Sequence, residues 1–255
     1  MPRVLKQLLY GIFYMVFFGA IGIGTYAFST RQAPTCVDGR QNGAETGIDC
    51  GGQSGCTPCD IKALKPLEAI SVEVFRFGDA VTVSVKARNP NAAYGSDDFH
   101  YRIDLYGSNN ALVRSISGSS FIYPSEEKYL VEAGIQDSRK LIKRAQFTVE
   151  PATMFWKRDS EFKRPEMAAE IGGVQFDSDL ASVILKVKNP NNFAIRNAEV
   201  TVSLADQGGA LVGISKTAVE RLVPFEEREA VIFLPAAQGM AIDPQALHAE
   251  VYPIR

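Results

Sequence analysis

The stretches VTVSVKARNPN (81–91) and SVILKVKNPN (182–191) are two copies of one pattern, and they decide the fold. In both copies, apolar side chains recur at every second position up to an Asn-Pro-Asn sequence. A period of two is typical of a strand with one buried face. Proline lacks an N–H and ends such a strand, and asparagine tolerates the turn geometry around it. Each stretch therefore predicts a half-buried strand followed by a turn.

The similarity between the two halves of the chain continues beyond these strands. Pro-Ser-Glu-Glu-Lys (124–128) corresponds to Pro-Phe-Glu-Glu-Arg (224–228), and Asn-Ala-Leu-Val (110–113) corresponds to Gly-Ala-Leu-Val (209–212). The offset between matching segments stays between 99 and 102 residues along the chain. An ordered series of matches at a nearly constant offset indicates an internal duplication.

The duplication sets the domain boundaries. We assign 61–155 to a first domain and 165–255 to a second. Between them, 156–164 carries six charged side chains in nine residues, which is typical of a solvated linker. We expect this linker to let the two domains behave nearly independently and the segment 61–155 to fold alone.

Alternating apolar residues in each domain predict its core. Short strands separated by turn sequences favour a sandwich of two antiparallel sheets, with every second side chain directed inward. The expected core residues are Val83, Val85, Ile103 and Leu105 in the first domain and Leu185, Val187, Val202 and Leu204 in the second.

Two duplicated polar motifs are candidates for binding or catalysis. Asn-Pro-Asn occurs at 89–91 and 189–191, where exposed asparagines could contact a sugar or a peptide. The Glu-Glu pairs at 126–127 and 226–227 could serve as paired catalytic carboxylates. Adjacent residues of a strand point to opposite faces, so the two carboxylates of a pair cannot act together on one substrate. We expect turns at the first motif and solvated strand starts at the second.

The N-terminal region is apolar over the length of a membrane span. From Leu8 to Phe28 the chain reads LLYGIFYMVFFGAIGIGTYAF, a run of 21 residues without a charge. As a helix this run covers roughly 30 Å, the thickness of the hydrocarbon layer of a bilayer. We therefore predict a single transmembrane helix over 7–29.

Flanking charges predict the orientation of this helix. Arg3 and Lys6 precede it, and positively charged flanks stay in the cytoplasm, so 1–6 should be cytoplasmic and the bulk of the chain extracytoplasmic. The competing interpretation is a cleaved signal peptide, because Ala27-Phe28-Ser29 resembles a cleavage site.

All four cysteines lie in the stalk that follows, 30–60. They are Cys36, Cys50, Cys56 and Cys59, and this segment has almost no apolar side chains with which to build a core. In an oxidising compartment we expect two disulfides as covalent staples, and the sequence leaves three pairings open. A zinc site with four cysteine ligands is the alternative, although Cys36 and Cys50 lack the short spacing of a ligand pair.

The acidic residues of the stalk are candidate calcium ligands. Asp38, Asn42 and Asp49 fall at positions 1, 5 and 12 of an EF-hand-type loop, with a glycine at position 6 for the sharp turn. Position 3 is Arg40, which cannot ligate, and Glu45 could contribute instead. We expect no other cofactor.

Two resemblances place the chain among surface proteins. The stalk resembles a short cysteine-rich module, C-x-D-G-x-x-N-G-x-E-T-x-x-D-C-G-G, found next to the membrane or between domains of bacterial surface proteins. The duplicated domains resemble β-sandwich domains of the FxLYD and late-embryogenesis-abundant type 2 families. Ile-Asp-Leu-Tyr-Gly (103–107) and Val-Ser-Leu-Ala-Asp (202–206) match the Phe-x-Leu-Tyr-Asp signature in part, and neither has its Phe. The resemblance implies immunoglobulin-like or fibronectin-like extracytoplasmic modules without catalytic residues.

Together these features predict a mainly β protein with one N-terminal transmembrane helix, a disulfide-stapled stalk and two tandem immunoglobulin- or fibronectin-like β-sandwiches. The formal net charge of −2 gives no basic footprint for nucleic acid. The chain has 2 histidines and none of the common nucleophile, metalloprotease or phosphate-loop motifs, so we expect no enzyme. The expected function is cell-envelope structure or protein–protein interaction, with the membrane and other surface proteins as partners. The alternative is a calcium-dependent or small-ligand receptor or sensor.

Overall fold

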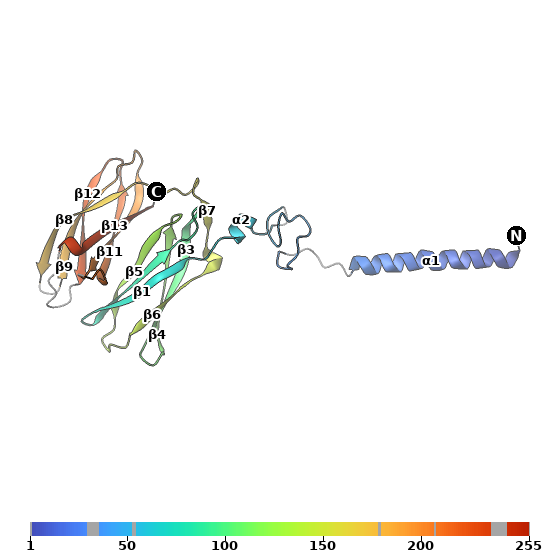
Figure 1. Ribbon diagram of the computed structural model, residues 1–255, viewed down its shortest axis with the longest axis horizontal. Helices are drawn as coiled ribbons and strands as arrows, with labels where there is room; N and C mark the ends of the chain where they lie inside the picture. Colours follow the sequence, from blue (N-terminus) through green and yellow to red (C-terminus); the bar gives the residue numbers. More distant parts are fainter. Residues whose placement is uncertain are drawn as a thin grey trace. The chain divides into compact units, whose positions relative to one another are not determined.

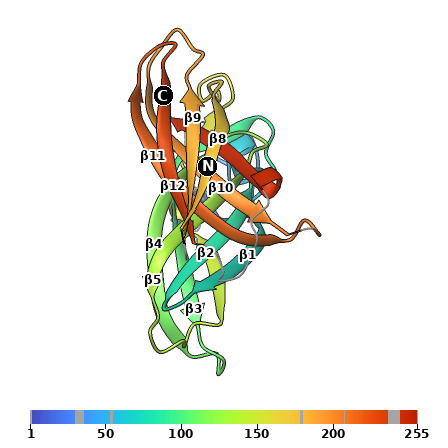
Figure 2. The same ribbon diagram turned by 90° about the vertical axis from the view of Figure 1, so that its left-hand side faces the viewer.

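The computed structural model describes residues 2–29, 36–52, 55–177, 180–206, 208–235 and 244–254. The chain divides into two compact units, 1–64 and 65–255. The first contains the N-terminal helix and the cysteine-rich segment, and the second contains both duplicated domains. The strands can be followed by colour from two sides in Figures 1 and 2.

The N-terminal helix α1 (Arg3–Ser29) exposes apolar side chains in all directions. Met15, Val16, Phe17 and Phe18 are each at least half exposed, and four consecutive residues point in four directions around a helix axis. The helix is long and apolar enough to cross a membrane, with a mean hydropathy of 1.8. A signal sequence has the same properties, so the helix alone does not distinguish an anchor from a cleaved signal.

The first duplicated domain is a β-sandwich of two antiparallel sheets. One sheet has the strand order β1-β2-β5 and the other β4-β3-β6, with β7 paired to β3. Its strands are β1 (Glu68–Phe77), β2 (Ala80–Arg88), β3 (Tyr94–Tyr106), β4 (Leu112–Ile122), β5 (Glu127–Gln136), β6 (Arg144–Val149) and β7 (Trp156–Arg158). A 3₁₀ turn, η1 (Pro151–Thr153), separates β6 from β7.

The second domain repeats this topology. Its sheets have the orders β8-β9-β12 and β11-β10-β13, which correspond one to one to those of the first domain. Its strands are β8 (Ala168–Asp177), β9 (Leu180–Lys188), β10 (Ile195–Ala205), β11 (Leu211–Leu222), β12 (Glu227–Pro235) and β13 (Leu247–Ile254), the last preceded by η2 (Pro244–Ala246). The mainly β fold with two sandwiches is therefore confirmed.

Each sandwich has its own core, formed by the inward-facing residues of both sheets. In register, Val85 of β2 pairs with Val72 and Leu130, and Leu185 of β9 pairs with Ile171 and Ala230. The eight core positions predicted from alternation are all at most 4% exposed: Val83, Val85, Ile103, Leu105, Leu185, Val187, Val202 and Leu204. Two separate apolar clusters result, one for each repeat.

The Asn-Pro-Asn turns are built around buried asparagine side chains. Asn89 is 1% exposed, its Nδ2 donates to the carbonyl of Tyr123 at 2.9 Å, and its Oδ1 accepts the N–H of Asn91 at 3.0 Å. Asn189 repeats the arrangement, with its Nδ2 3.0 Å from the carbonyl of Val223. These bonds hold the chain entering β5 or β12 against the end of β2 or β9, so the motif has the structural role expected of it.

The prediction of a solvated strand start is wrong for Glu126. Its Oε2 accepts the N–H of Tyr123 at 2.8 Å, as Glu226 accepts the N–H of Val223 at 2.7 Å in the second repeat. Glu126 is only 5% exposed, with Arg164 Nη1 3.2 Å from its Oε1, whereas Glu226 is partly exposed.

The segment 156–164 also differs from the solvated linker predicted for it. Its first three residues form β7, where Trp156 pairs with Ser96 of the first sandwich. Farther along, the ring of Phe162 stacks on Tyr123 with 4.4 Å between centroids. The backbone and aromatic rings of this segment pack, and two of its cations, Lys157 and Arg164, pair with carboxylates of the first sandwich, an arrangement that composition alone does not reveal.

Candidate functional site

The stalk is held together by two disulfides. Cys36 is bonded to Cys56 and Cys50 to Cys59, which selects one of the three pairings that the sequence left open. All four cysteines are consumed, so the structure favours disulfide staples over a zinc site with four thiolate ligands. The short helix α2 (Cys59–Lys62) carries the last of these cysteines, and Lys62 Nζ donates to the carbonyl of Asp49 at 3.1 Å.

The four candidate calcium ligands belong to one hydrogen-bonded network inside the stalk. Asn42 Nδ2 donates to Asp38 Oδ2 at 2.7 Å, and the N–H of Asn42 donates to Glu45 Oε2 at 3.2 Å. Asp49 accepts the N–H of Gly39, the residue after Asp38, at 2.9 Å. The acids thus satisfy backbone donors of a segment that has no apolar core, which is a structural role.

One ligand atom of this network remains unused. The side-chain oxygen Oδ1 of Asn42 is buried and accepts no hydrogen bond from any described residue. Gly43, the glycine expected at the sharp turn, has a φ of 61°, a left-handed conformation that favours glycine. Hydrogen bonds thus link Asp38 and Glu45 through Asn42, whereas Asp49 is bonded to the backbone of Gly39.

A second candidate site is the contact between the two sandwiches, which sequence reasoning missed. Phe121, Tyr123 and Tyr252 form an aromatic cluster in which they are 5%, 2% and 1% exposed. Tyr123 Oη donates to the carbonyl of Pro253 at 2.7 Å, and Tyr252 Oη accepts the N–H of Tyr129 at 3.2 Å. Burial raises the pKa of Tyr123 and of Tyr252, so both hydroxyls stay neutral at physiological pH.

The contact also contains a fully buried lysine. Lys128 of β5 is 0% exposed, with its Nζ 3.5 Å from the centroid of the Phe121 ring and 3.1 Å from Ser120 Oγ. Across the contact, Glu199 of β10 lies 3.4 Å from the same Nζ. Burial lowers the pKa of Lys128, and the Glu199 carboxylate opposes that shift. A buried charge of this kind is tolerated only when it is paired and solvated by neighbouring groups.

A third charged group, Arg164, lies between the two repeats. Its Nη1 is 3.2 Å from Glu126 Oε1, and its Nη2 donates to the carbonyl of Val251 on β13 at 2.8 Å. Burial raises the pKa of Glu126, opposed by the N–H of Tyr123 and by the Arg164 guanidinium. Arginine here serves as a bridge between the first sandwich and the last strand of the second.

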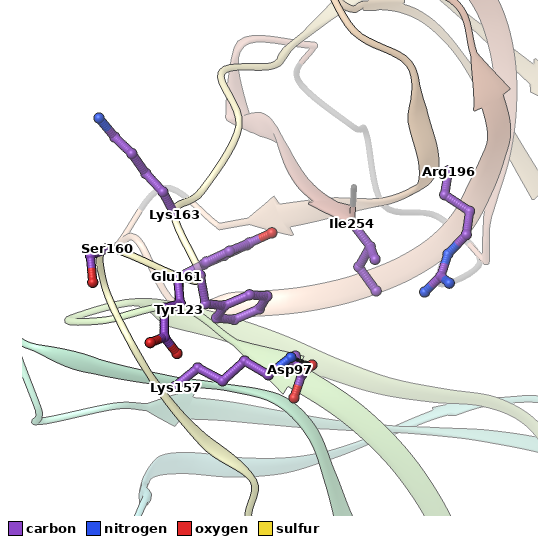
Figure 3. Close-up of a pocket in the computed structure, with 9 residues that line it drawn as sticks. Asp97, Tyr123, Lys157, Ser160, Glu161, Lys163, Arg196 and Ile254 are labelled. Atoms are coloured by element: carbon purple, nitrogen blue, oxygen red, sulfur yellow. Dashed lines mark hydrogen bonds and ion pairs between the residues drawn. The ribbon is translucent and has the colours of Figure 1, made fainter.

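Beside this contact is a hollow of about 450 Å³, shown in Figure 3. It is lined by Asp97, Tyr123, Lys157, Ser160, Glu161, Phe162, Lys163, Arg196 and Ile254. Lys157 and Asp97 form an ion pair on one wall, and their side chains meet in the picture. The lining mixes cations, carboxylates and the hydroxyls of Tyr123 and Ser160, and the Lys157 ammonium is engaged by Asp97.

The two histidines do not share a site. His100 lies on β3 and His248 on β13, in different sandwiches, and both are exposed. Neither lines the hollow.

Comparisons with known proteins assign no family. No family model matches the chain, and no curated protein matches it. Among solved structures, red sea bream transglutaminase is similar with 11% identity and a TM-score of 0.23, over 74% of this chain and 31% of that one. The match spans about a third of the transglutaminase chain, and a likeness this weak carries no argument about function.

Proposed function

We propose that this protein is a non-enzymatic, single-pass membrane protein that presents its two β-sandwiches outside the cytoplasm, for cell-envelope structure or protein–protein interaction. The observation that carries the proposal is the exposure of α1. Its apolar residues are exposed on every side, and only a lipid environment or a partner helix would remove that surface from water.

Two further observations support an extracytoplasmic location. The stalk depends on two disulfides, which persist in oxidising compartments. Arg3 and Lys6 precede the apolar run, and α1 contains no acidic residue, as expected for a helix whose N-terminus stays in the cytoplasm.

The non-enzymatic proposal is supported by how the strongest polar candidates are used. The duplicated Asn-Pro-Asn and Glu-Glu motifs hold turns, while the buried Lys128 and Glu126 and the partly exposed Arg164 hold one sandwich against the other. These side chains are engaged in contacts that stabilise the fold, so we place the function on the outer surfaces of the sandwiches.

The test is protease access to intact cells or spheroplasts. Protease added outside should remove the sandwiches, with the N-terminal peptide remaining in the membrane fraction. Digestion only after the membrane is broken would overturn the orientation. A mature protein that begins after residue 28 and washes off with alkaline carbonate would overturn the anchor and favour a cleaved signal.

A second candidate function is calcium binding by the stalk, which the buried and unused Oδ1 of Asn42 favours. Together with the carboxylates of Asp38 and Glu45 it would offer the hard oxygen ligands that this ion prefers. Calorimetric titration of the full chain in detergent with CaCl₂ tests the idea. Binding that disappears in Asp38→Asn and persists in Asp60→Asn, a matched control in the same unit, is the expected result. The absence of a heat signal at millimolar calcium would exclude it.

A further inference from the structure

One outward sheet face is covered in the first repeat and uncovered in the second. In the first sandwich, the outward face of the β1-β2-β5 sheet is covered: Thr82, Ser84 and Val131 are 3%, 1% and 0% exposed. The strand β11 of the second sandwich packs against β2 and β5 at this face. Ile214 of β11 is also 0% exposed, although alternation directs it away from its own core. This face of the first repeat is thus a sheet-on-sheet interface.

The same face of the second repeat is uncovered. The β8-β9-β12 sheet corresponds to β1-β2-β5, and Val231 corresponds to Val131 in both offset and register: Val131 pairs with Ser84, and Val231 pairs with Ile184. Val231 is 46% exposed and Phe233, on the same side of β12, is 59% exposed. Where the covered copy has a serine at 84, the uncovered copy has the larger apolar Ile184. We call Ile184, Val231 and Phe233 the β12 face.

We propose that the β12 face is the interface of a symmetric dimer, in which it packs against the same face of a second copy of this chain. Neighbouring apolar side chains on the outer side of a sheet are the feature that marks interaction surfaces. Single exposed apolar residues are ordinary, but these three are adjacent on paired strands, and in the other repeat the corresponding surface is already buried.

The choice of a second copy follows from the other outward faces of the chain. The surface that covers the first repeat is the outer side of β11-β10-β13, and in any second copy that surface is occupied by its own first sandwich. Its counterpart in the first repeat is the outer side of β4, which presents Ser115, Ser117 and Ser119, all exposed and polar. Exposed apolar side chains also occur at the hairpin end of β4, at Leu112 and Val113, but the β12 face, with three such side chains on two paired strands, is the surface that two copies can match to each other.

Charges beside the β12 face fit a two-fold arrangement. On the same outward side, Lys186 of β9 is in register with Glu229 of β12, and Lys188 is in register with Glu227. Positively and negatively charged side chains therefore both lie next to the apolar residues. In an isologous contact each copy offers the same patch, so a lysine of one copy can meet a glutamate of the other.

Cysteine cross-linking of the full chain in detergent tests the proposal. The four native cysteines are bonded to one another, so Val231→Cys adds a single reactive thiol. A short bifunctional maleimide should convert the Val231→Cys protein to a covalent dimer. Ser117→Cys, the matched control on the polar outer face of β4, should remain monomeric.

A second substitution separates this interface from any association through α1. Adding Phe233→Glu to Val231→Cys should reduce cross-linking at least tenfold, because it places two carboxylates in an apolar contact. Phe233 is mostly exposed, so circular dichroism should show an unchanged fold. Cross-linking that survives Phe233→Glu, equal cross-linking at Ser117→Cys, or a monomer by sedimentation of the unmodified protein would each overturn the proposal. The last result would point instead to a different protein as the partner of this face.

Discussion

Lys128 and Glu199 form an ion pair, 3.4 Å apart, that links β5 of the first sandwich to β10 of the second, and the lysine is completely buried. Lys86 and Glu127 form a more exposed pair within one sheet, whereas Lys216 of β11 and Glu132 of β5, 3.8 Å apart, also join the two repeats. The Lys128–Glu199 pair is the buried link between the repeats, and its loss should affect both.

The first prediction concerns this pair. Glu199→Ala leaves the buried ammonium of Lys128 without a counter-charge, which should lower the free energy of unfolding by about 3–5 kcal/mol. Glu127→Ala, which removes the partner of the partly exposed Lys86, should cost about 0–1 kcal/mol. Urea unfolding followed by the fluorescence of the single tryptophan, Trp156, measures both. Because Trp156 belongs to the first sandwich and Glu199 to the second, an unchanged midpoint for Glu199→Ala would show that the repeats are not coupled.

The second prediction is that the two equivalent glutamates have opposite pH dependence. The pKa of Glu126 is raised by burial, so the folded state holds its proton more tightly than the unfolded state. This carboxyl therefore costs stability as pH rises above its ordinary pKa of 4.5, and Glu126→Gln should become progressively more stable than wild type over that window.

Glu226 is the matched control. Its pKa is lowered by the N–H of Val223 and by Arg228, so its contribution to stability is present above pH 4.5 and is lost as pH falls through the lowered value. Glu226→Gln should therefore be less stable than wild type at neutral pH and equal to it in strong acid. Thermal unfolding of both variants at several pH values is the measurement. If both variants were stabilised relative to wild type at neutral pH, or both destabilised, the proposed difference between the environments of Glu126 and Glu226 would be contradicted.

The third prediction concerns the independence of the repeats. Leu204 is 4% exposed in the second core, and Leu204→Ala should cost about 2–5 kcal/mol. The sequence led us to expect an effect confined to the second domain, but the buried contact through Tyr123 and Tyr252 now predicts that the first sandwich is destabilised as well. Calorimetry should show one transition shifted to lower temperature. Two transitions, with only one of them shifted, would restore the independent-domain interpretation.

The fourth prediction concerns the stalk. Its fold rests on the Cys36–Cys56 and Cys50–Cys59 bonds, whereas 65–255 contains no cysteine. Reduction should therefore make 36–64 susceptible to limited proteolysis and leave the unfolding temperature of the sandwiches unchanged. Mass spectrometry of the peptides gives the cleavage sites and, on the unreduced protein, the pairing. Peptides linking Cys36 to Cys50 or to Cys59 would contradict the pairing.

Much of the architecture could be predicted from local chemistry. Val83 and Val85 alternate with polar residues, and that alternation alone directs them into a core wherever the strand pairs. Asn89 and Asn189 stand where a proline ends a strand. The charge-free run in α1 would expose apolar side chains to water on all sides, which favours a membrane span. The need for staples in the stalk followed from its lack of apolar residues, but their pairing depends on how the loop brings Cys36 close to Cys56.

Tertiary structure alone decided the environment of identical residue types. Glu126 and Glu226 begin equivalent strands and make the same backbone bond, yet one is buried with a raised pKa and the other is partly exposed with a lowered one. Val131 and Val231 likewise occupy one position of the repeat, one covered and one open. A period-two pattern predicts which face of a strand a side chain lies on, because the strand backbone directs successive side chains to opposite faces. It does not predict what lies against that face, because this depends on distant segments that only the folded chain brings together, as with β11 against β2 and β5.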